Sequence, residues 1–382
     1  MKDKNIQELI NLYHSGKLTV VKKKVIELIK KNPKSFVLYN LFGAILSSQK
    51  NFGKAIVNYK KSIAINPDYA EGHNNLGSAL YKLGKFNESI ISYNKAIQIK
   101  INFAEAHNNL AVTFKELGKL NESIIGFKKA IEIKSNYAEA YNNLGAAYKE
   151  LGKFTESIEN HQKAIKIKSH YPEAHNNLAL TFKELGKFKE SINSFRKAIE
   201  IKADYAEAYN NLGNILKILG KFNDSIDNYK KAIEIKPSFS EAYNNFGTVL
   251  MEINKVEESI LYYKKAIKIN ANYAEAYNNL GNLFRDIGKI DDANKCFKKL
   301  IALKPENIGY KINSAGLIAP IVQSVDEINF YRDKYSKSLQ SLKDCRFITE
   351  KPGYAIRLNI FNLAYHAKSN LEIMKKTSVF FR

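Results

Sequence analysis

The sequence predicts an all-α fold, a right-handed superhelix (an α-solenoid) of helix-turn-helix repeats with a helical C-terminal extension. A phrase of the form A-E-A-[HY]-N-N-L-[GA] returns every 34 residues, and two apolar series at helical spacing follow each of its starts. A fixed period of this length indicates stacked supersecondary units rather than one globular core. The phrase begins at Ala70, Ala104, Ala138, Pro172, Ala206, Ser240 and Ala274.

The first helix of each repeat is predicted from positions 4, 7, 8 and 11, counted from the start of the phrase. In the repeat from Ala138 these are Tyr141, Leu144, Gly145 and Tyr148, which share one face of a helix. Position 15 should end this helix in a left-handed turn, a conformation that favours Gly or Asn. The residues at position 15 are Gly84, Gly118, Gly152, Gly186, Gly220, Asn254 and Gly288.

A second helix is predicted from the apolar series at positions 17, 20, 21, 24, 27, 28 and 30. Small residues at positions 8, 20 and 27 should allow close helix approach, with large aromatic residues at position 24 between them. His161 takes position 24 in its repeat, and we expect it to be a core aromatic residue. We expect the same packing role at position 4 for His73, His107 and His175.

Three regions follow from this register. Residues 36–307 form eight 34-residue units, of which the first, beginning at Phe36, is the loosest. Residues 1–35 look like a degenerate N-terminal unit or cap, with Gly16 and Pro33 in register. The register fails at residue 308, and residues 308–382 are predicted to be a helical, connector-like region with helices over 317–325 and 328–342.

The repeat resembles the tetratricopeptide repeat (TPR), whose signature is aromatic-x2-L-G-x2-Y followed by Ala, aromatic, Ala and Pro at set offsets. Pro67, Pro237 and Pro305 occupy the proline position. In the tail, the phrase from Asn359 to His366, with Asn370 after it, resembles the connector of bacterial O-GlcNAc-transferase-like (SPINDLY-type) glycosyltransferases. The resemblance covers the TPR region and connector without the catalytic domain, because the chain ends at Arg382, where that domain would begin.

A double asparagine stands at positions 5 and 6 of seven repeats, and Asn is a mediocre helix former. We expect both columns to face the open side of the first helix, so that Asn142→Ala should cost far less stability than Leu144→Ala. One interpretation is structural, with one Asn bonding to the backbone of the neighbouring repeat. The other is functional, with a row of amides in a concave groove that binds the backbone of an extended peptide. The resemblance to O-GlcNAc transferases, which carry such a ladder, implies position 6 as the binding column: Asn75, Asn109, Asn143, Asn177, Asn211, Asn245 and Asn279.

The formal net charge of +22 raises the possibility of a nucleic-acid partner, yet its distribution is diffuse. Residues 1–35 and 308–382 each carry a net +6, and the rest is spread over eight repeats; Lys22, Lys23 and Lys24 form the one dense basic run. The charge distribution therefore argues against a nucleic-acid partner. No membrane span or secretory signal is visible, and Cys296 and Cys345 form neither a disulfide framework nor a metal-ligand spacing, which favours a cytoplasmic setting.

The predicted function is a protein–protein interaction scaffold that binds an extended polypeptide or a partner protein in the concave groove through the asparagine ladder. We expect no catalytic, cofactor-binding or metal-binding residue, and hence no enzyme activity of the chain by itself. The alternative is the substrate-recognition half of a split or truncated protein O-GlcNAc-transferase-like glycosyltransferase. That activity would depend on a nucleotide sugar and on a separate catalytic chain as partner.

Overall fold

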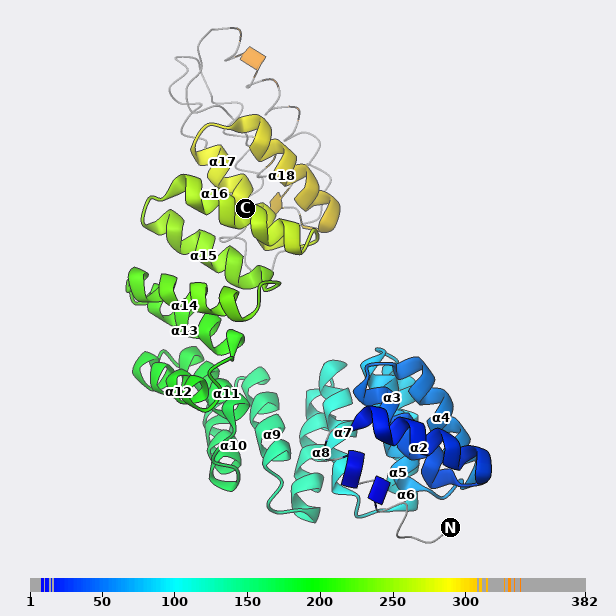
Figure 1. Cartoon of the computed structure of the whole chain (residues 1–382). Helices are drawn as coiled ribbons and strands as arrows, with labels where there is room; N and C mark the ends of the chain where they lie inside the picture. Colours follow the sequence, from blue (N-terminus) through cyan, green and yellow to red (C-terminus); the bar gives the residue numbers. More distant parts are fainter. Residues whose placement is uncertain are drawn as a thin grey trace. The chain divides into compact units, whose positions relative to one another are not determined.

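The computed structural model describes residues 17–307 without a break. It also describes residues 8, 9, 11–13 and 15 before them, and residues 309, 310, 314, 326, 329, 330, 333 and 337 after them. The described residues form helices and turns and contain no strand, which confirms the all-α prediction. The chain divides into two compact units, residues 1–202 and 203–382, with the boundary between two repeats (Figure 1).

Every repeat from residue 36 to residue 307 folds as two helices in the predicted register. The first helix has 13 residues and the second has 14 in each repeat, as in α9 and α10. In unit 1 the first helices are α3 (Phe36–Ser48), α5 (Ala70–Lys82), α7 (Ala104–Glu116), α9 (Ala138–Glu150) and α11 (Pro172–Glu184). Their second helices are α4 (Phe52–Ile65), α6 (Phe86–Ile99), α8 (Leu120–Ile133), α10 (Phe154–Ile167) and α12 (Phe188–Ile201).

Unit 2 continues the same alternation. Its first helices are α13 (Ala206–Ile218), α15 (Ser240–Glu252) and α17 (Ala274–Asp286). Its second helices are α14 (Phe222–Ile235), α16 (Val256–Ile269) and α18 (Ile290–Leu303). Within each unit the two helices of a repeat pack on one another, and each second helix packs on the first helix of the next repeat. Contacts of this kind, between neighbours in the chain, define an α-solenoid.

The turn between the two helices has the predicted left-handed residue at position 15. The six glycines there have φ between +68° and +78°, and Asn254 has φ +60°. The first repeat places Lys50 at this position with φ +58°, an uncommon conformation for a residue with a Cβ. A left-handed residue therefore ends the first helix in all eight repeats.

Small and large residues at fixed positions fit the two helices together. A Cβ added at Gly77 (position 8) would lie 2.7 Å from the ring of Tyr93 (position 24), so only a residue without a side chain fits. Ser89, at position 20, donates its hydroxyl hydrogen to the carbonyl oxygen of Gly77 at 2.9 Å. Where position 8 is Ala, as at Ala111 and Ala179, position 24 is Phe. Positions 8 and 24 are therefore matched within each helix pair.

The N-terminal region covers the apolar face of the first repeat. Helix α2 (Leu18–Lys31) packs against α3, and its buried Val21 and Val25 share a core cluster with Leu38 and Ile45. Gly16, Cys345, the helix expected over 317–325, the phrase 359–366 and Asn370 lie outside the described residues. Residues 329, 330, 333 and 337 are described within the helix expected over 328–342, and they are helical.

Candidate functional site

Five of the seven position-5 asparagines are buried, and the other two, Asn74 and Asn278, are half-buried. Asn142 is 5% exposed, Asn210 1% and Asn244 0%. The expectation that this column faces the open side of the first helix is therefore wrong. Position 5 lies on the side of the first helix that faces the next repeat. Within each unit, the first helix of the next repeat contacts that side and covers it.

The position-6 asparagines connect the repeats through their side chains. In six pairs, four within unit 1 and two within unit 2, Nδ2 at position 6 donates a hydrogen bond to Oδ1 at position 5 of the preceding repeat. The bonds in unit 1 are Asn75 to Asn40 (3.0 Å), Asn109 to Asn74 (3.1 Å), Asn143 to Asn108 (3.1 Å) and Asn177 to Asn142 (3.2 Å). Those in unit 2 are Asn245 to Asn210 (3.0 Å) and Asn279 to Asn244 (3.0 Å). The structural interpretation expected a bond to backbone, whereas the acceptor is another carboxamide.

Glutamates at position 2, which the sequence interpretation passed over, complete this network in unit 2. Nδ2 of Asn210 donates to Glu241 Oε1 at 2.9 Å, and Nδ2 of Asn244 donates to Glu275 Oε1 at 3.2 Å. Asn210 and Asn244 thus each bond to two side chains of the following repeat, one at position 2 and one at position 6. The recurrence of Glu in the phrase A-E-A was the sequence signal for this role.

The predicted binding column is partly accessible. Six of its members are half-buried, and Asn245 is buried at 9% exposure. The bond to position 5 uses one of the two N–H groups of each Nδ2, since a carboxamide has two donors and an acceptor oxygen with two lone pairs. Half-buried Asn75, Asn109, Asn143 and Asn177 follow one another through α5, α7, α9 and α11 of unit 1. Their role as a binding surface stays a prediction.

Many lysines of the chain have partners at the repeat boundaries. Lys100 at position 31 pairs with Glu71 of the same repeat at 3.2 Å, and its ammonium lies 4.7 Å from the ring centroid of Phe103. The same pairing joins Lys134 to Glu105, Lys168 to Glu139 and Lys236 to Glu207. These exposed ion pairs contribute little stability each, but they offset part of the basic excess locally.

A second charged row lies at positions 12 and 13 of the first helices. Lys115 pairs with Glu150 of the next repeat at 3.0 Å, and Lys183 lies 3.8 Å from Glu184. Burial lowers the pKa of Lys149, against the opposing effect of the charges of Glu150 and Glu184. Acids and lysines alternate here, so this part of unit 1 carries no strong field of one sign.

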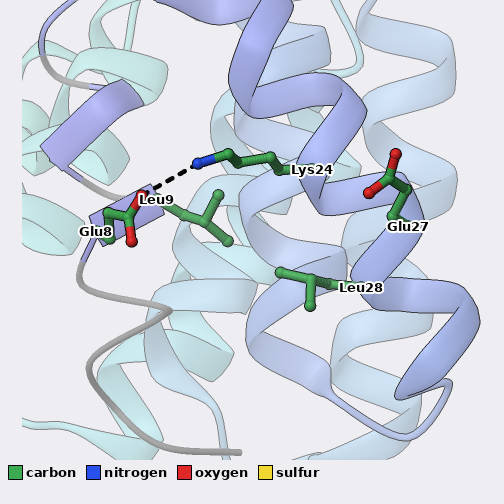
Figure 2. A pocket seen from close by; sticks show the side chains of 5 residues that line it. All are labelled: Glu8, Leu9, Lys24, Glu27 and Leu28. Carbon is green, nitrogen blue, oxygen red and sulfur yellow. Dashed lines mark hydrogen bonds and ion pairs between the residues drawn. The ribbon is translucent and has the colours of Figure 1, made fainter.

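Two lysines of the dense basic run 22–24 also have polar partners. Lys24 forms an ion pair with Glu8 at 3.1 Å, in a pocket of about 210 Å³ that Leu9, Glu27 and Leu28 also line (Figure 2). Lys22 donates to the side-chain carbonyl of Gln49 at 3.0 Å. The pocket is smaller than a typical small-molecule site and contains none of the predicted site residues.

The histidines and the described cysteine fit packing roles. His161 is fully buried, as expected, and His73, His107 and His175 are half-buried. A ring nitrogen of His73 lies 2.9 Å from the carbonyl oxygen of Pro67, where it closes the preceding turn. Burial raises the pKa of the Cys296 thiol to about 11, which keeps this group protonated and weakly nucleophilic near neutral pH.

Asn142→Ala should lower the free energy of unfolding by about 1–3 kcal/mol, because it leaves buried donors without their acceptor. Oδ1 of Asn142 accepts from Asn177 Nδ2 at 3.2 Å and lies 2.9 Å from Nδ1 of His161. Chemical denaturation followed by circular dichroism measures the loss. Asn143→Ala is the matched control, since this half-buried side chain makes one inter-repeat bond and should lose less. Equal midpoints for Asn142→Ala and wild type would contradict the buried role.

The geometry defines a class of protein, the helical repeat scaffold with an amide-lined connection between repeats. The TPR repeat profile matches residues 43–84, 77–118, 113–152, 146–186, 180–220 and 247–285, more than half of the chain. Two further tetratricopeptide repeat profiles match residues 206–239 and 274–307. The chain belongs to the tetratricopeptide repeat family, and a protein-interaction scaffold is the function that this family membership supports.

Solved structures show the same fold. A chain of the APC/C hetero-tetramer Cut9–Hcn1 is 17% identical, with a TM-score of 0.56 over 70% of this chain and 52% of its own length. The present chain thus spans about half the length of that relative. A tetratricopeptide repeat protein from Parabacteroides merdae is 18% identical, with a TM-score of 0.53 over 69% of this chain and 99% of its own. A comparison with curated proteins gives no significant match. Among the described residues, none of the helices has the length and apolar character needed to cross a membrane.

Proposed function

We propose that the chain binds an extended polypeptide or an extended segment of a partner protein along the position-6 asparagines. The observation that carries this proposal is the row of half-buried carboxamides, one per repeat, each held in place by a bond to the preceding repeat. A carboxamide held in this way loses little side-chain entropy when it binds a ligand.

The ligand chemistry follows from the amide group. A carboxamide can accept from a peptide N–H and donate to a peptide C=O at the same time. Such contacts are made to main chain and are tolerant of the ligand's side chains. We call each position-6 carboxamide a rung of the ladder. Consecutive first helices contact one another in unit 1, so neighbouring rungs should be roughly 8–10 Å apart, which is the length of about three residues of extended chain.

Replacing Asn109, Asn143 and Asn177 of unit 1 together by Ala should weaken binding by at least about tenfold, because each net hydrogen bond contributes about 0.5–1.5 kcal/mol. Each single replacement should have a much smaller effect. The probe is a pool of fluorescent synthetic peptides of about 15 residues and varied sequence, long enough for several rungs. Fluorescence anisotropy measures the affinity, and circular dichroism verifies that helical content is unchanged.

The matched control replaces the position-5 partners Asn74, Asn108 and Asn142 together by Ala. This variant loses connections of the same kind between repeats but keeps the position-6 amides. If position 6 contacts the ligand, the position-5 variant should bind better than the position-6 variant at a temperature where both are folded. Wild-type affinity of the position-6 variant would exclude this column as the ligand surface.

The second hypothesis is the substrate-recognition half of an O-GlcNAc-transferase-like glycosyltransferase. Its support is the phrase from Asn359 to His366, which lies outside the described residues. A glycosyltransferase reading frame directly downstream, whose product transfers sugar to protein only when this chain is added, would support it. A downstream region without such a frame would count against it.

A further inference from the structure

The basic charge of the repeat array is concentrated at its N-terminal end. Residues 17–66 contain eleven lysines and one acid, Glu27, whereas residues 67–307 contain 35 basic and 29 acidic residues. The basic block spans the N-terminal cap and the first repeat, so an average over either region alone conceals it. This end of unit 1 therefore has a positive field that the later repeats, which are close to charge balance, do not share.

A row of exposed aliphatic residues begins in the same place. Position 22, near the middle of the second helix, is Val57 in α4, Ile91 in α6 and Ile125 in α8. These residues are 53%, 70% and 68% exposed. Helices α4 and α6 both pack on α5, and α6 and α8 both pack on α7. The three residues therefore follow one another along the second-helix side of unit 1.

The repeat itself does not require an apolar residue at position 22. The next three repeats have Glu159, Asn193 and Asp227 there, and all three are exposed. Single exposed aliphatic residues are common on protein surfaces and need no explanation. Three of them in consecutive repeats, at a position that is polar elsewhere in the same chain, indicate a surface with an apolar partner.

Lysines surround the first residue of this row. Lys54, Lys60 and Lys61 lie three or four residues from Val57 in α4, and side chains at these spacings are neighbours on a helix. Helix α4 contains no acid with which they could pair within the helix. An aliphatic side chain among ammonium groups matches the interface of an anionic membrane, where apolar groups enter the acyl boundary and lysines bind the headgroups.

A pocket beside Val57 has the same two-part chemistry. About 250 Å³ of space lies between α2, α3 and α4, with Phe42 and Leu46 as apolar lining and Lys22 and Lys54 as cationic lining. The lysines suit the phosphate or carboxylate of a lipid headgroup, and the apolar side suits the first carbons of an acyl chain. A single amphipathic lipid can therefore satisfy both parts of the pocket.

We propose that the second-helix face of the first three repeats binds the surface of an anionic membrane. Val57, Ile91 and Ile125 enter the acyl boundary, and the lysines of residues 17–66 contact the headgroups. The asparagine ladder lies on the first helices instead. The inference is thus independent of the proposed function, and either one can fail without the other.

The aliphatic row favours lipid over nucleic acid as the partner of this face. Phosphate contacts would account for the lysines, but they would leave the row exposed to water. Single-stranded nucleic acid stacks on aromatic side chains, whereas position 22 is Val or Ile in these three repeats. Residues 17–66 also contain no arginine, the residue best suited to bidentate phosphate contacts.

The experiment measures sedimentation of the full chain with vesicles. One set contains phosphatidylcholine with about 30% phosphatidylserine and the other phosphatidylcholine alone, both at about 0.15 M salt. We expect the partition coefficient to be at least about tenfold higher for the anionic set, since each lysine near such a surface strengthens binding by about fivefold. Equal partition into the two sets, or none into either, would overturn the proposal.

Ile91→Asn with Ile125→Asn tests the aliphatic row without changing the charge. Asn193 occupies the same position of a later repeat, so the replacement is compatible with the fold. Partition into anionic vesicles should fall by at least about tenfold, because full burial of one such side chain changes an equilibrium by at least that factor. Leu261→Asn is the control, since Leu261 is 50% exposed at position 22 of unit 2 and lies outside the basic block.

Lys60→Gln with Lys61→Gln tests the charged part of the face. Partition should again fall by at least about tenfold, from the contribution of two lysines near the headgroups. Lys230→Gln with Lys231→Gln is the matched control, at the same positions of a later repeat where each lysine pairs with an acid of its own helix. Equal losses for the two variants would show that binding depends on net charge rather than on this face, and would overturn the proposal.

The remaining outcomes separate lipid from nucleic acid. The second probe is a fluorescent RNA of about 20 nucleotides. RNA binding that is lost in the lysine variant, without preference for anionic vesicles, would assign the face to nucleic acid and overturn the proposal. Vesicle binding that is unchanged in the double Asn variant would reduce it to electrostatic adsorption and overturn it too. Circular dichroism verifies the fold, and Ile91→Asn alone replaces the double variant if helical content falls.

Discussion

Leu144→Ala is expected to destabilise the protein by roughly 2–5 kcal/mol, the range for removing a buried Leu side chain and leaving a cavity. Leu144 is 4% exposed and lies in a core cluster with Phe127 of the preceding second helix and Tyr148 of its own helix. The change therefore weakens the packing between two repeats. Denaturant unfolding measures it as a lower midpoint.

Leu151→Ala is the control in the same repeat, since it is the same chemical change at a residue that is 38% exposed. It should cost much less, because little apolar surface is removed from a packed environment. Similar losses for the two variants would mean that the packing between α8 and α9 is not what holds these repeats together.

The protein should lose stability as the pH falls below about 6.5, and His161 should account for a defined part of that loss. Burial lowers the pKa of His161 from 6.5 to about 3, with a further contribution from the charge of Lys149. Below pH 6.5 the unfolded chain binds a proton at this residue and the folded chain does not. The contribution of His161 therefore lowers the free energy of unfolding by about 1.4 kcal/mol for each pH unit between about pH 6.5 and pH 3.

His161→Phe isolates this contribution, because repeats of the same chain have Phe127 and Phe195 at the same position. The stability difference between wild type and variant should change in the variant's favour as the pH is lowered from 7 to 4.5, by roughly 2–3 kcal/mol. Other titrating groups are shared and cancel in the difference. Parallel pH profiles for the two proteins would show that His161 titrates normally in the folded state.

The fold was predictable because the same helix and turn signals recur in seven consecutive repeats. Helix boundaries follow from the apolar series, and each turn follows from the left-handed residue at position 15, of which Gly152 is one. The first repeat shows the limit of residue identity, since Lys50 adopts the same conformation without being Gly or Asn. The 34-residue spacing nevertheless places Lys50 at position 15 of the first repeat, and so gave the location of the turn correctly.

The asparagine columns were predictable as a feature but not in their arrangement. Helical periodicity gives the direction in which Asn142 points from its own helix, but the neighbour that covers this direction depends on how repeats stack. The bond from Asn177 joins residues 35 apart, one more than the period, so a repeat-by-repeat comparison does not pair them. Glu241 was missed because a glutamate in a first helical turn is explained by the helix dipole alone.

The matching of position 8 to position 24 limits how such a gene can be recombined. Gly145 faces His161 and Gly213 faces Tyr229 within their own repeats, whereas Ala179 belongs with Phe195. A crossover at a repeat boundary transfers both members of a pair and preserves the fit of the two helices. A crossover inside the turn at position 15 can join an alanine to a tyrosine and create a clash. Whole 34-residue repeats are thus the units that can be duplicated, lost or exchanged in this chain. The number of repeats can change in this way without any change in the packing within each helix pair.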